Sequence, residues 1–342
     1  MALSLVNCKL GSNGGSITLP GAGKSGLHDL FGKGKCIDSE GGDIDTEYRN
    51  WEPVDYSSWL PKELPDRRIR YGSDTQHFAE LRIPKTDKLR SANGYPVLVV
   101  IHGGAWRSDS PLSQTAPLAE ALTGLGLVTW NIEFRRLGNT GGGYPNTPLD
   151  AGLAVDYLRT LAPEYNLDLS RVIILGHSSG GHLALWTSSR HKIDPASSLY
   201  VADPLPIKGV ISLGSIANMQ MAYEGGRADM LTFLGVETTQ EAELLYPNIS
   251  PYLLLPTGVP TSHFVGAHDD AWRINGLKQY SDESIAQGTP SHNFVLEGAR
   301  EYDLIDPCSP AWPTLVQEVF WVMDEQPPNT NLNKSKFCPL TR

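Results

Sequence analysis

The amino-acid sequence predicts a three-layer α/β fold, in which a mostly parallel sheet is covered by helices on both faces. From about residue 78 onward, short runs of valine, isoleucine and leucine alternate with longer segments of helical character. These runs are apolar at nearly every position, which is typical of parallel strands that are buried on both faces of a sheet. The 342 residues, 40% of them hydrophobic, suffice for one large domain with its own core.

The predicted elements follow one another in the order expected for such a fold. Strands are expected at residues 78–84, 95–104, 127–134, 171–178, 207–214, 261–270 and 292–299. Helices are expected at residues 147–162, 180–190 and 311–325. The segment 217–255 interrupts this alternation, so we expect it to form a small lid within the domain.

The two ends of the chain lie outside this pattern. Residues 1–67 are rich in glycine and serine and only weakly periodic, so we expect an irregular N-terminal extension that is able to cover the pocket. The α/β domain is expected to span residues 68–325, and residues 326–342 form a C-terminal tail. The stretch GAGKSG at 21–26 is similar to a phosphate-binding loop, but that motif requires glycine where this chain has Thr18.

Composition excludes several classes of partner. The 28 basic and 38 acidic residues give a net charge of −10 without a basic run, so a nucleic-acid partner is not expected. No apolar stretch approaches the roughly 18 residues of a membrane span, and the N-terminus does not resemble a signal peptide, which predicts a cytoplasmic protein without a membrane partner. The four cysteines are widely spaced, and no metal-ligand cluster or dinucleotide fingerprint is present, so no metal or cofactor is expected.

A nucleophile motif occurs in the segment RVIILGHSSGGHLALW. Here G-x-S-x-G, from Gly176 to Gly180, stands between a buried strand and a helix, the context in which this motif forms a nucleophile elbow. The two glycines permit a sharp turn that lifts Ser178 above the sheet edge. At that point the N-terminus of the helix favours developing negative charge. The pattern therefore predicts Ser178 as a nucleophile.

A second motif, IHGGAW at residues 101–106, follows the strand that we expect beside the elbow. Gly103 and Gly104 let backbone N–H groups turn toward a substrate carbonyl. Together with the N–H of Ser179, they would form an oxyanion hole in which each donor contributes roughly 3–4 kcal/mol. An HGG motif followed along the chain by a nucleophile elbow forms a specific pair of motifs.

With NIEFRRLGNTGGGYP and DLIDPCSPAW, these motifs make residues 68–325 similar to α/β-hydrolases of the esterase/lipase branch that includes kynurenine formamidase-like enzymes. The resemblance implies a Ser–Asp–His triad in that order along the chain. On matching positions, Ser178 is the nucleophile. FVGAHDDAW places the acid at Asp269, with Asp270 as the alternative.

The third triad position departs from the family pattern. Where the family has G-x-x-H after the last strand, residues 298–301 read GARE, so Glu301 stands in the place of histidine. Among the histidines, His268 adjoins Asp269 at the expected edge of the sheet and is the alternative base, whereas His292 is expected at the far end of its strand.

A carboxylate at position 301 changes the expected chemistry. Two carboxylates in one poorly hydrated pocket raise the pKa of one of them, so Glu301 could hold a proton near neutral pH unless Arg300 pairs with it. A carboxylate is also a weaker base than imidazole for a serine hydroxyl, so efficient hydrolysis is less certain than proton transfer to a bound substrate.

Three functions remain compatible with these residues. The first is hydrolysis of a small-molecule ester, lactone or aryl amide through Ser178. The second is non-hydrolytic acid–base catalysis in secondary metabolism, by a cyclase, dehydratase, isomerase or lyase. The third is a catalytically silent binding protein. Trp106 and Tyr302, which flank the two site motifs, either line an aromatic pocket or pack in the core. The oligomeric state is not predicted.

Overall fold

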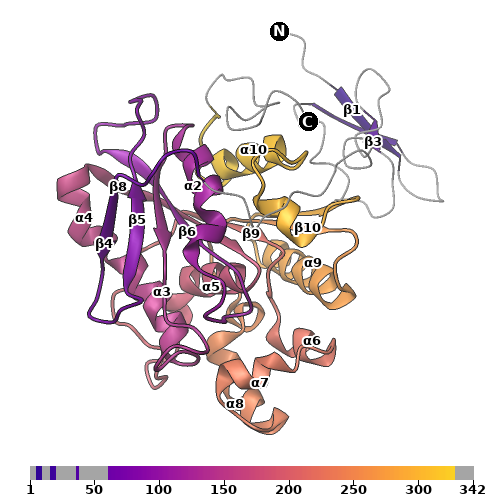
Figure 1. Cartoon of the computed structure of the whole chain (residues 1–342). Coiled ribbons are helices and arrows are strands. Elements are labelled where there is room, and N and C mark those ends of the chain that lie inside the picture. Colours follow the sequence, from indigo (N-terminus) through magenta and orange to yellow (C-terminus); the bar gives the residue numbers. More distant parts are fainter. Residues whose placement is uncertain (1–4, 10–15, 21–35, 38–60, 328–342) are drawn as a thin grey trace.

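The computed structural model describes residues 5–9, 16–20, 36–37 and 61–327 (Figure 1). The stretch GAGKSG and most of the C-terminal tail therefore lie outside the described residues, as does most of the N-terminal extension. The described parts of the extension are β1 (Leu5–Lys9), β2 (Ser16–Pro20) and β3 (Cys36–Ile37), which form an antiparallel sheet in the order β2-β1-β3. The expectation of an irregular extension is thus wrong for these segments.

The main sheet has eight strands in the order β11-β10-β9-β8-β6-β7-β5-β4. Neighbouring strands from β11 to β7 are parallel, and β5 and β4 are added antiparallel at one edge. The bounds are β4 Arg67–Arg70, β5 Phe78–Arg82, β6 Tyr95–Ile101, β7 Val128–Ile132, β8 Leu167–His177, β9 Gly209–Leu213, β10 Thr261–Gly266 and β11 Ser291–Leu296. The predicted mostly parallel sheet is confirmed, and β4, with a single apolar residue, is the strand that the sequence did not predict.

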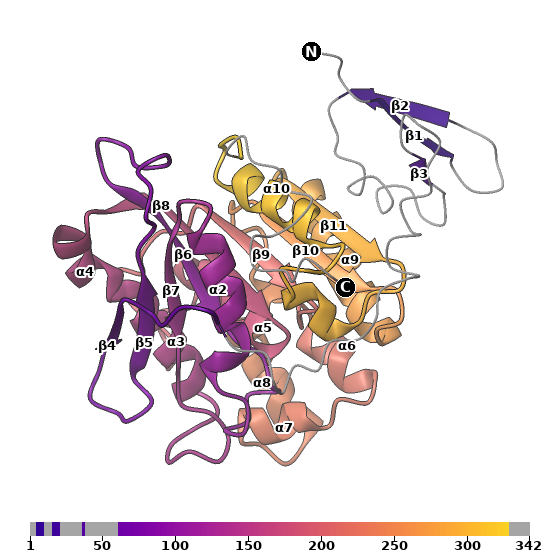
Figure 2. The same ribbon diagram turned by 45° about the horizontal axis from the view of Figure 1, so that its top comes forward.

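Helices cover both faces of this sheet (Figures 1 and 2). One face carries α2 (Ala116–Thr123) and α10 (Trp312–Val322). The other carries α3 (Asn146–Asp156), α4 (Leu158–Tyr165), α5 (Ser179–Ser188) and α9 (Ala271–Ala286). The helix expected at 147–162 is two helices, because a tight turn in which the Thr160 N–H donates to the Tyr157 carbonyl separates α3 from α4.

The central strand β6 shows how the sequence produces two cores. Its seven residues are all buried, and successive side chains point to opposite faces. Val97 and Val99 belong to the core beneath α3 and α5, whereas Leu98 and Val100 belong to the core beneath α2 and α10. A continuously apolar strand is therefore required, because both of its faces are covered by helices.

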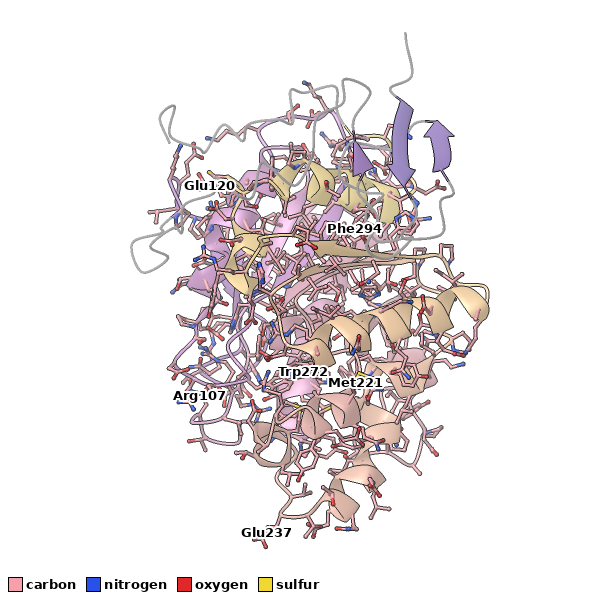
Figure 3. The ribbon with its side chains drawn as sticks, turned by 90° about the vertical axis from the view of Figure 1, so that its right-hand side faces the viewer. Arg107, Glu120, Met221, Glu237, Trp272 and Phe294 are labelled. Atoms are coloured by element: carbon pink, nitrogen blue, oxygen red, sulfur yellow. The ribbon has the colours of Figure 1, made fainter. Side chains whose placement is uncertain are left out.

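The segment expected to form a lid is helical and lies between β9 and β10. It contains α6 (Met219–Glu224), α7 (Asp229–Leu234), α8 (Thr239–Ile249) and the short 3₁₀ helix η4 (Pro251–Leu254). In Figure 3, Met221 of α6 lies next to Trp272 at the start of α9, where the lid meets the main domain. Within the described residues, no helix is long and apolar enough to cross a bilayer.

Candidate active site

Ser178 occupies a sharp turn between β8 and α5, as the elbow motif predicts. Its backbone has φ 53° and ψ −120°, a conformation that residues with a side chain rarely adopt, and its N–H donates to the Leu213 carbonyl at 2.7 Å. The glycines permit close backbone contacts. A Cβ atom at Gly176 would lie 2.2 Å from the Gly180 carbonyl oxygen, and one at Gly180 would lie 2.2 Å from the His102 carbonyl oxygen.

Glu301 lies beside Ser178. It begins the 3₁₀ helix η5 (Glu301–Ile305), which follows β11, and the Ser178 hydroxyl lies near enough to its carboxylate to lower the Glu301 pKa. The backbone of Glu301 is held by the elbow, because Nε2 of His177 lies 3.0 Å from its carbonyl oxygen and donates to it. The hydroxyl and the carboxylate that the sequence places at the nucleophile and histidine positions are therefore in contact.

Asp269 follows the end of β10, at the same edge of the sheet. Its Oδ2 accepts a hydrogen bond from the Gly266 N–H at 3.1 Å, which fixes the carboxylate against the strand end. Asp269 does not contact Glu301 through a shared proton. Instead, the guanidinium of Arg273 stands next to both carboxylates, with Nη1 3.1 Å from Glu301 Oε2 and 3.5 Å from Asp269 Oδ1. The alternative acid, Asp270, is exposed and precedes α9.

Arg273 is the residue of the site that sequence reasoning missed. It lies in the first turn of α9, its side chain is only 5% exposed, and it stands four residues after Asp269. That spacing is the available signal, since residues four apart on a helix face one another. Arg300, which the sequence suggested as a partner for Glu301, instead pairs with Asp303 at 3.0 Å.

The charges around Glu301 decide its protonation. Burial raises its pKa, but His177, Arg273 and the Ser178 hydroxyl together outweigh burial, so the pKa of Glu301 lies below its ordinary value. Burial raises the pKa of Asp269 above its ordinary value, although Arg273 and the Gly266 N–H oppose this. The expectation that Glu301 holds a proton near neutral pH is therefore wrong, because a cation separates the two carboxylates.

The loop that contains Gly103, Gly104 and Trp106 contacts the elbow directly. The Trp106 N–H donates to Ser179 Oγ at 3.2 Å, and Gly104 has φ 107°, which few residues other than glycine adopt. The Gly103 N–H already donates to Oε1 of Gln114 at 3.2 Å. A substrate oxygen would have to displace that amide to use Gly103, which leaves the N–H groups of Gly104 and Ser179 as the oxyanion donors to consider.

His102 of the same loop has a structural role. It is fully buried, its Nε2 lies 3.0 Å from Glu133 Oε1, and its ring stacks on Phe134. Glu133 also pairs with Arg136 at 3.0 Å and accepts the Leu112 N–H at 3.1 Å. Burial raises the pKa of Glu133, but these partners outweigh burial and leave it below the ordinary value. Through His102, Glu133 thus anchors the oxyanion loop at residues 101–106.

Among the described residues, the side chains of His268, His182 and His292 have other surroundings than the Ser178 hydroxyl. His268, the alternative base, is exposed on the turn after β10. His182 Nε2 donates to the Ile249 carbonyl at 2.9 Å and so connects α5 to the lid, and burial lowers its pKa to about 4. His292 pairs with Glu318 of α10 at 2.8 Å, which agrees with its expected place at the far end of β11. The structure gives His268 no contact that would support a role as base.

The two aromatic residues have different surroundings. Trp106 is 1% exposed and stacks on Phe233 of α7 with ring centroids 4.2 Å apart. Trp106 therefore packs in the core and does not line a pocket. Tyr302 is 39% exposed, and its ring lies 5.5 Å from that of His177. A pocket of about 370 Å³ adjoins the oxyanion loop. Its walls mix polar and apolar groups, from Ala105, Arg107, Ser108, Asp109, Leu137, Gly138, Asp229 and Thr232.

Among the described residues, no group of three or more His, Cys, Asp and Glu side chains is arranged to hold a metal ion. The arrangement is instead that of an acyl-transfer site: a hydroxyl on an elbow, a carboxylate in contact with it, and backbone donors beside it. The family comparison agrees with this geometry. The model of the BD-FAE family matches residues 83–274, more than half of the chain.

The chain belongs to the BD-FAE family. The matched segment contains the oxyanion loop, the elbow, Asp269 and Arg273, and it ends before Glu301. The departure from histidine therefore lies beyond the part of the chain that the BD-FAE model covers.

Individual relatives agree with the family. Esterase LipC of Mycobacterium tuberculosis is 28% identical over 118 residues, which span 34% of this chain and 28% of the relative. A truncated carbohydrate esterase from gut microbiota has a TM-score of 0.65 at 16% identity, over 78% of this chain and 98% of the other. The esterase Est2 of Thermogutta terrifontis with propionate bound has a TM-score of 0.53 at 21% identity, over 68% of this chain and 83% of the other. These structural likenesses confirm the α/β-hydrolase fold.

Proposed function

We propose that this BD-FAE protein is an esterase in which Ser178 is the nucleophile, Glu301 is the general base and Asp269 is an auxiliary acid. The observation that carries the proposal is Ser178 on an elbow with the strained backbone of a nucleophile, with the Glu301 carboxylate near enough to its hydroxyl for the Glu301 pKa to be lowered by it. The names of the relatives, an esterase and a carbohydrate esterase, support the same class of reaction.

The proposed reaction passes through an acyl-enzyme. Ser178 Oγ attacks the ester carbonyl carbon while Glu301 takes the hydroxyl proton, and the N–H groups of Gly104 and Ser179 bind the oxyanion. Collapse of the tetrahedral intermediate breaks the bond to the leaving alcohol, which takes the proton back from Glu301. Water then attacks the acyl group, Glu301 accepts a proton from that water, and Ser178 is released with its proton restored.

The pocket beside the oxyanion loop bears on the substrate. Its walls carry an ion pair between Arg107 and Asp109, the hydroxyls of Ser108 and Thr232, and the Asp229 carboxylate. Such walls suit a polar leaving group that forms hydrogen bonds, so we favour a short-chain ester of a hydroxyl-rich alcohol such as a sugar. An aryl amide of the kind implied by the resemblance to kynurenine formamidase-like enzymes is the alternative substrate.

The geometry of the site argues against non-hydrolytic catalysis and against a silent binding protein. A non-hydrolytic acid catalyst would need a protonated carboxyl group, and Arg273 beside Glu301 favours the ionised form. A silent binding protein would have no need of a hydroxyl on a strained elbow in contact with an ionised carboxylate. Secondary metabolism remains a compatible setting for an esterase on a small molecule.

The proposal is tested by measuring hydrolysis of p-nitrophenyl acetate, an acetylated sugar and an aryl formamide by the purified protein. We expect turnover of the two esters, none by Ser178→Ala, and a loss of about 10²–10⁴-fold in Glu301→Gln, the usual contribution of a general base. His268→Gln is the matched control and should leave the rate unchanged. Activity that survives Ser178→Ala would rule out the proposed mechanism.

A further inference from the structure

The position of Arg273 raises a question about charge. A serine hydrolase with histidine as base has a neutral imidazole beside an ionised aspartate, so the pair carries one negative charge. When the imidazole takes the serine proton, the pair becomes neutral. Replacing histidine by an ionised glutamate would add a second negative charge to a half-buried site, and like charges at close range disfavour ionisation of both.

Arg273 removes that excess charge. With its guanidinium between Glu301 and Asp269, at 3.1 Å and 3.5 Å, the three groups together carry one negative charge before proton transfer and none after it. These are the same charges that an imidazole and an aspartate would carry at each stage. The exchange of histidine for glutamate is therefore matched by a cation elsewhere in the sequence.

We propose that Arg273 is a positioning residue that allows a glutamate to act as the base of this site, by holding the Glu301 carboxylate ionised and directed at Ser178. This inference rests on the proposed function, and it assigns Arg273 a role through Glu301 rather than through contact with substrate. Asp269 Oδ1 lies 3.5 Å from the same Nη1 atom of Arg273.

The surroundings of Arg273 are built to keep it in place. Its guanidinium carbon lies 5.1 Å from the centre of the Trp272 ring. Gly214, which follows β9, borders the pair, since a Cβ atom there would be in van der Waals contact with Arg273 Nη1 at 3.5 Å and with Glu301 Cγ at 3.6 Å. A buried cation in such a place requires an anion, and Glu301 is the one in closest contact.

Other charged and titratable groups also act on Glu301 from the elements around it. His177 of the elbow and Arg227 of the lid interact with it electrostatically, as do Asp269 and Tyr302. Arg227 is itself paired with Asp229 at 2.6 Å, and burial lowers the pKa of His177, which favours its neutral form. Arg273 differs from His177 in being a permanent cation, and it acts on Glu301 both through its charge and through a 3.1 Å ion pair.

The first test measures the ionisation of Glu301 directly and does not depend on activity. Protein labelled with ¹³C at the glutamate carboxyl carbons is titrated by NMR, and Glu301→Gln assigns the signal. We expect Glu301 to titrate below the ordinary glutamate value of about 4.3 in the natural protein and above it in Arg273→Gln. Arg273→Lys, which keeps the charge, should preserve the low value, and Arg227→Gln should change it less. An unchanged titration in Arg273→Gln would overturn the inference.

The second test compares variants in p-nitrophenyl acetate hydrolysis at pH 7. In the natural background, Arg273→Gln should lower kcat by about 100-fold with little change in KM, the size of effect expected from a misplaced catalytic group. In the Glu301→His background, the same substitution should raise kcat, because the cation there opposes protonation of the imidazole. Loss of kcat in both backgrounds would mean that Arg273 is only structural.

The two tests separate the two proposals. If Arg273→Gln changes the titration of Glu301 but Ser178→Ala still hydrolyses esters, the mechanism fails and the role of Arg273 in ionising Glu301 stands. If ester hydrolysis depends on Ser178 but the titration is unchanged, the esterase stands and the role of Arg273 is wrong.

Discussion

At the scale of single residues, the carboxylate at position 301 determines the pH range of activity. The reaction requires ionised Glu301, whose pKa His177, Arg273 and Ser178 lower despite burial, so activity should be lost only as pH falls through that lowered pKa. We expect a constant kcat between pH 7 and 5. The double variant Glu301→His with Arg273→Gln should lose activity across the same range, because imidazole protonates near pH 6.5. A fall of kcat between pH 7 and 5 in the natural protein would contradict the assignment of Glu301 as base.

Glu133 is the single residue on which the oxyanion loop depends most. Glu133→Ala would leave Arg136 as a buried cation without its carboxylate and His102 without its hydrogen-bond partner. We expect a loss of about 3–5 kcal/mol in the free energy of unfolding, measured by urea denaturation. Asp282→Ala, which removes an exposed pair with Lys278, should cost less than about 1 kcal/mol. Equal effects would show that the Glu133 cluster adds no stability.

At the scale of elements, the contact between the elbow and the oxyanion loop leaves no room for a methyl group at Gly180. Gly180→Ala would place a Cβ atom 2.2 Å from the His102 carbonyl oxygen. We therefore expect the free energy of unfolding, measured by thermal denaturation, to fall by about 1–3 kcal/mol, and esterase activity to be lost. The matched control is Gly276→Ala in α9, where the nearest atom is 3.6 Å away and helix propensity should add about 0.5–1 kcal/mol. Stabilisation by both substitutions would contradict this packing.

The sequence predicted the elements that have a strong pattern and missed those that do not. All seven expected strands are present: β6 is a continuous apolar run, and shorter apolar groups such as Phe264 and Val265 mark strands that also contain polar residues. The long helix α9 was missed, since AWRINGLKQYSDESIA is largely polar and its buried face, although regularly spaced, includes Arg273, Gly276, Ser281 and Ser284. The short helix α2 was also missed, and β4 has too few apolar residues to be recognised.

The candidate site was predictable in part, for a physical reason. Ser178 and Asp269 stand in motifs at strand ends, and parallel strands bring their carboxyl ends to one edge of the sheet. Glu301 followed from the order of these motifs along the chain. Arg273 belongs to no motif, and its role appears only when the distances to Glu301 and Asp269 are known. The raised pKa expected for Glu301 was wrong because this cation was not foreseen.

At the scale of the whole molecule, the cytoplasmic location stays a prediction. Cys308 is disulfide-bonded, and disulfide bonds persist mainly in oxidising compartments. A Cys308 disulfide that persists in the native protein would count against the cytoplasmic prediction. Cell fractionation, with thiol labelling before and after reduction, decides between these locations, and recovery of reduced protein from the cytosol would support the original prediction.

In the proposed mechanism, the fold places the Glu301 carboxylate so that it activates Ser178. Reaction of the purified protein with a fluorophosphonate, followed by peptide mass spectrometry, tests this most directly, with Ser178→Ala as the blank and Glu301→Gln as the comparison. We expect an adduct on Ser178 in the natural protein that forms about 10²–10⁴-fold more slowly in Glu301→Gln. An adduct that forms equally fast in both proteins, or that forms only in Glu301→His, would contradict it.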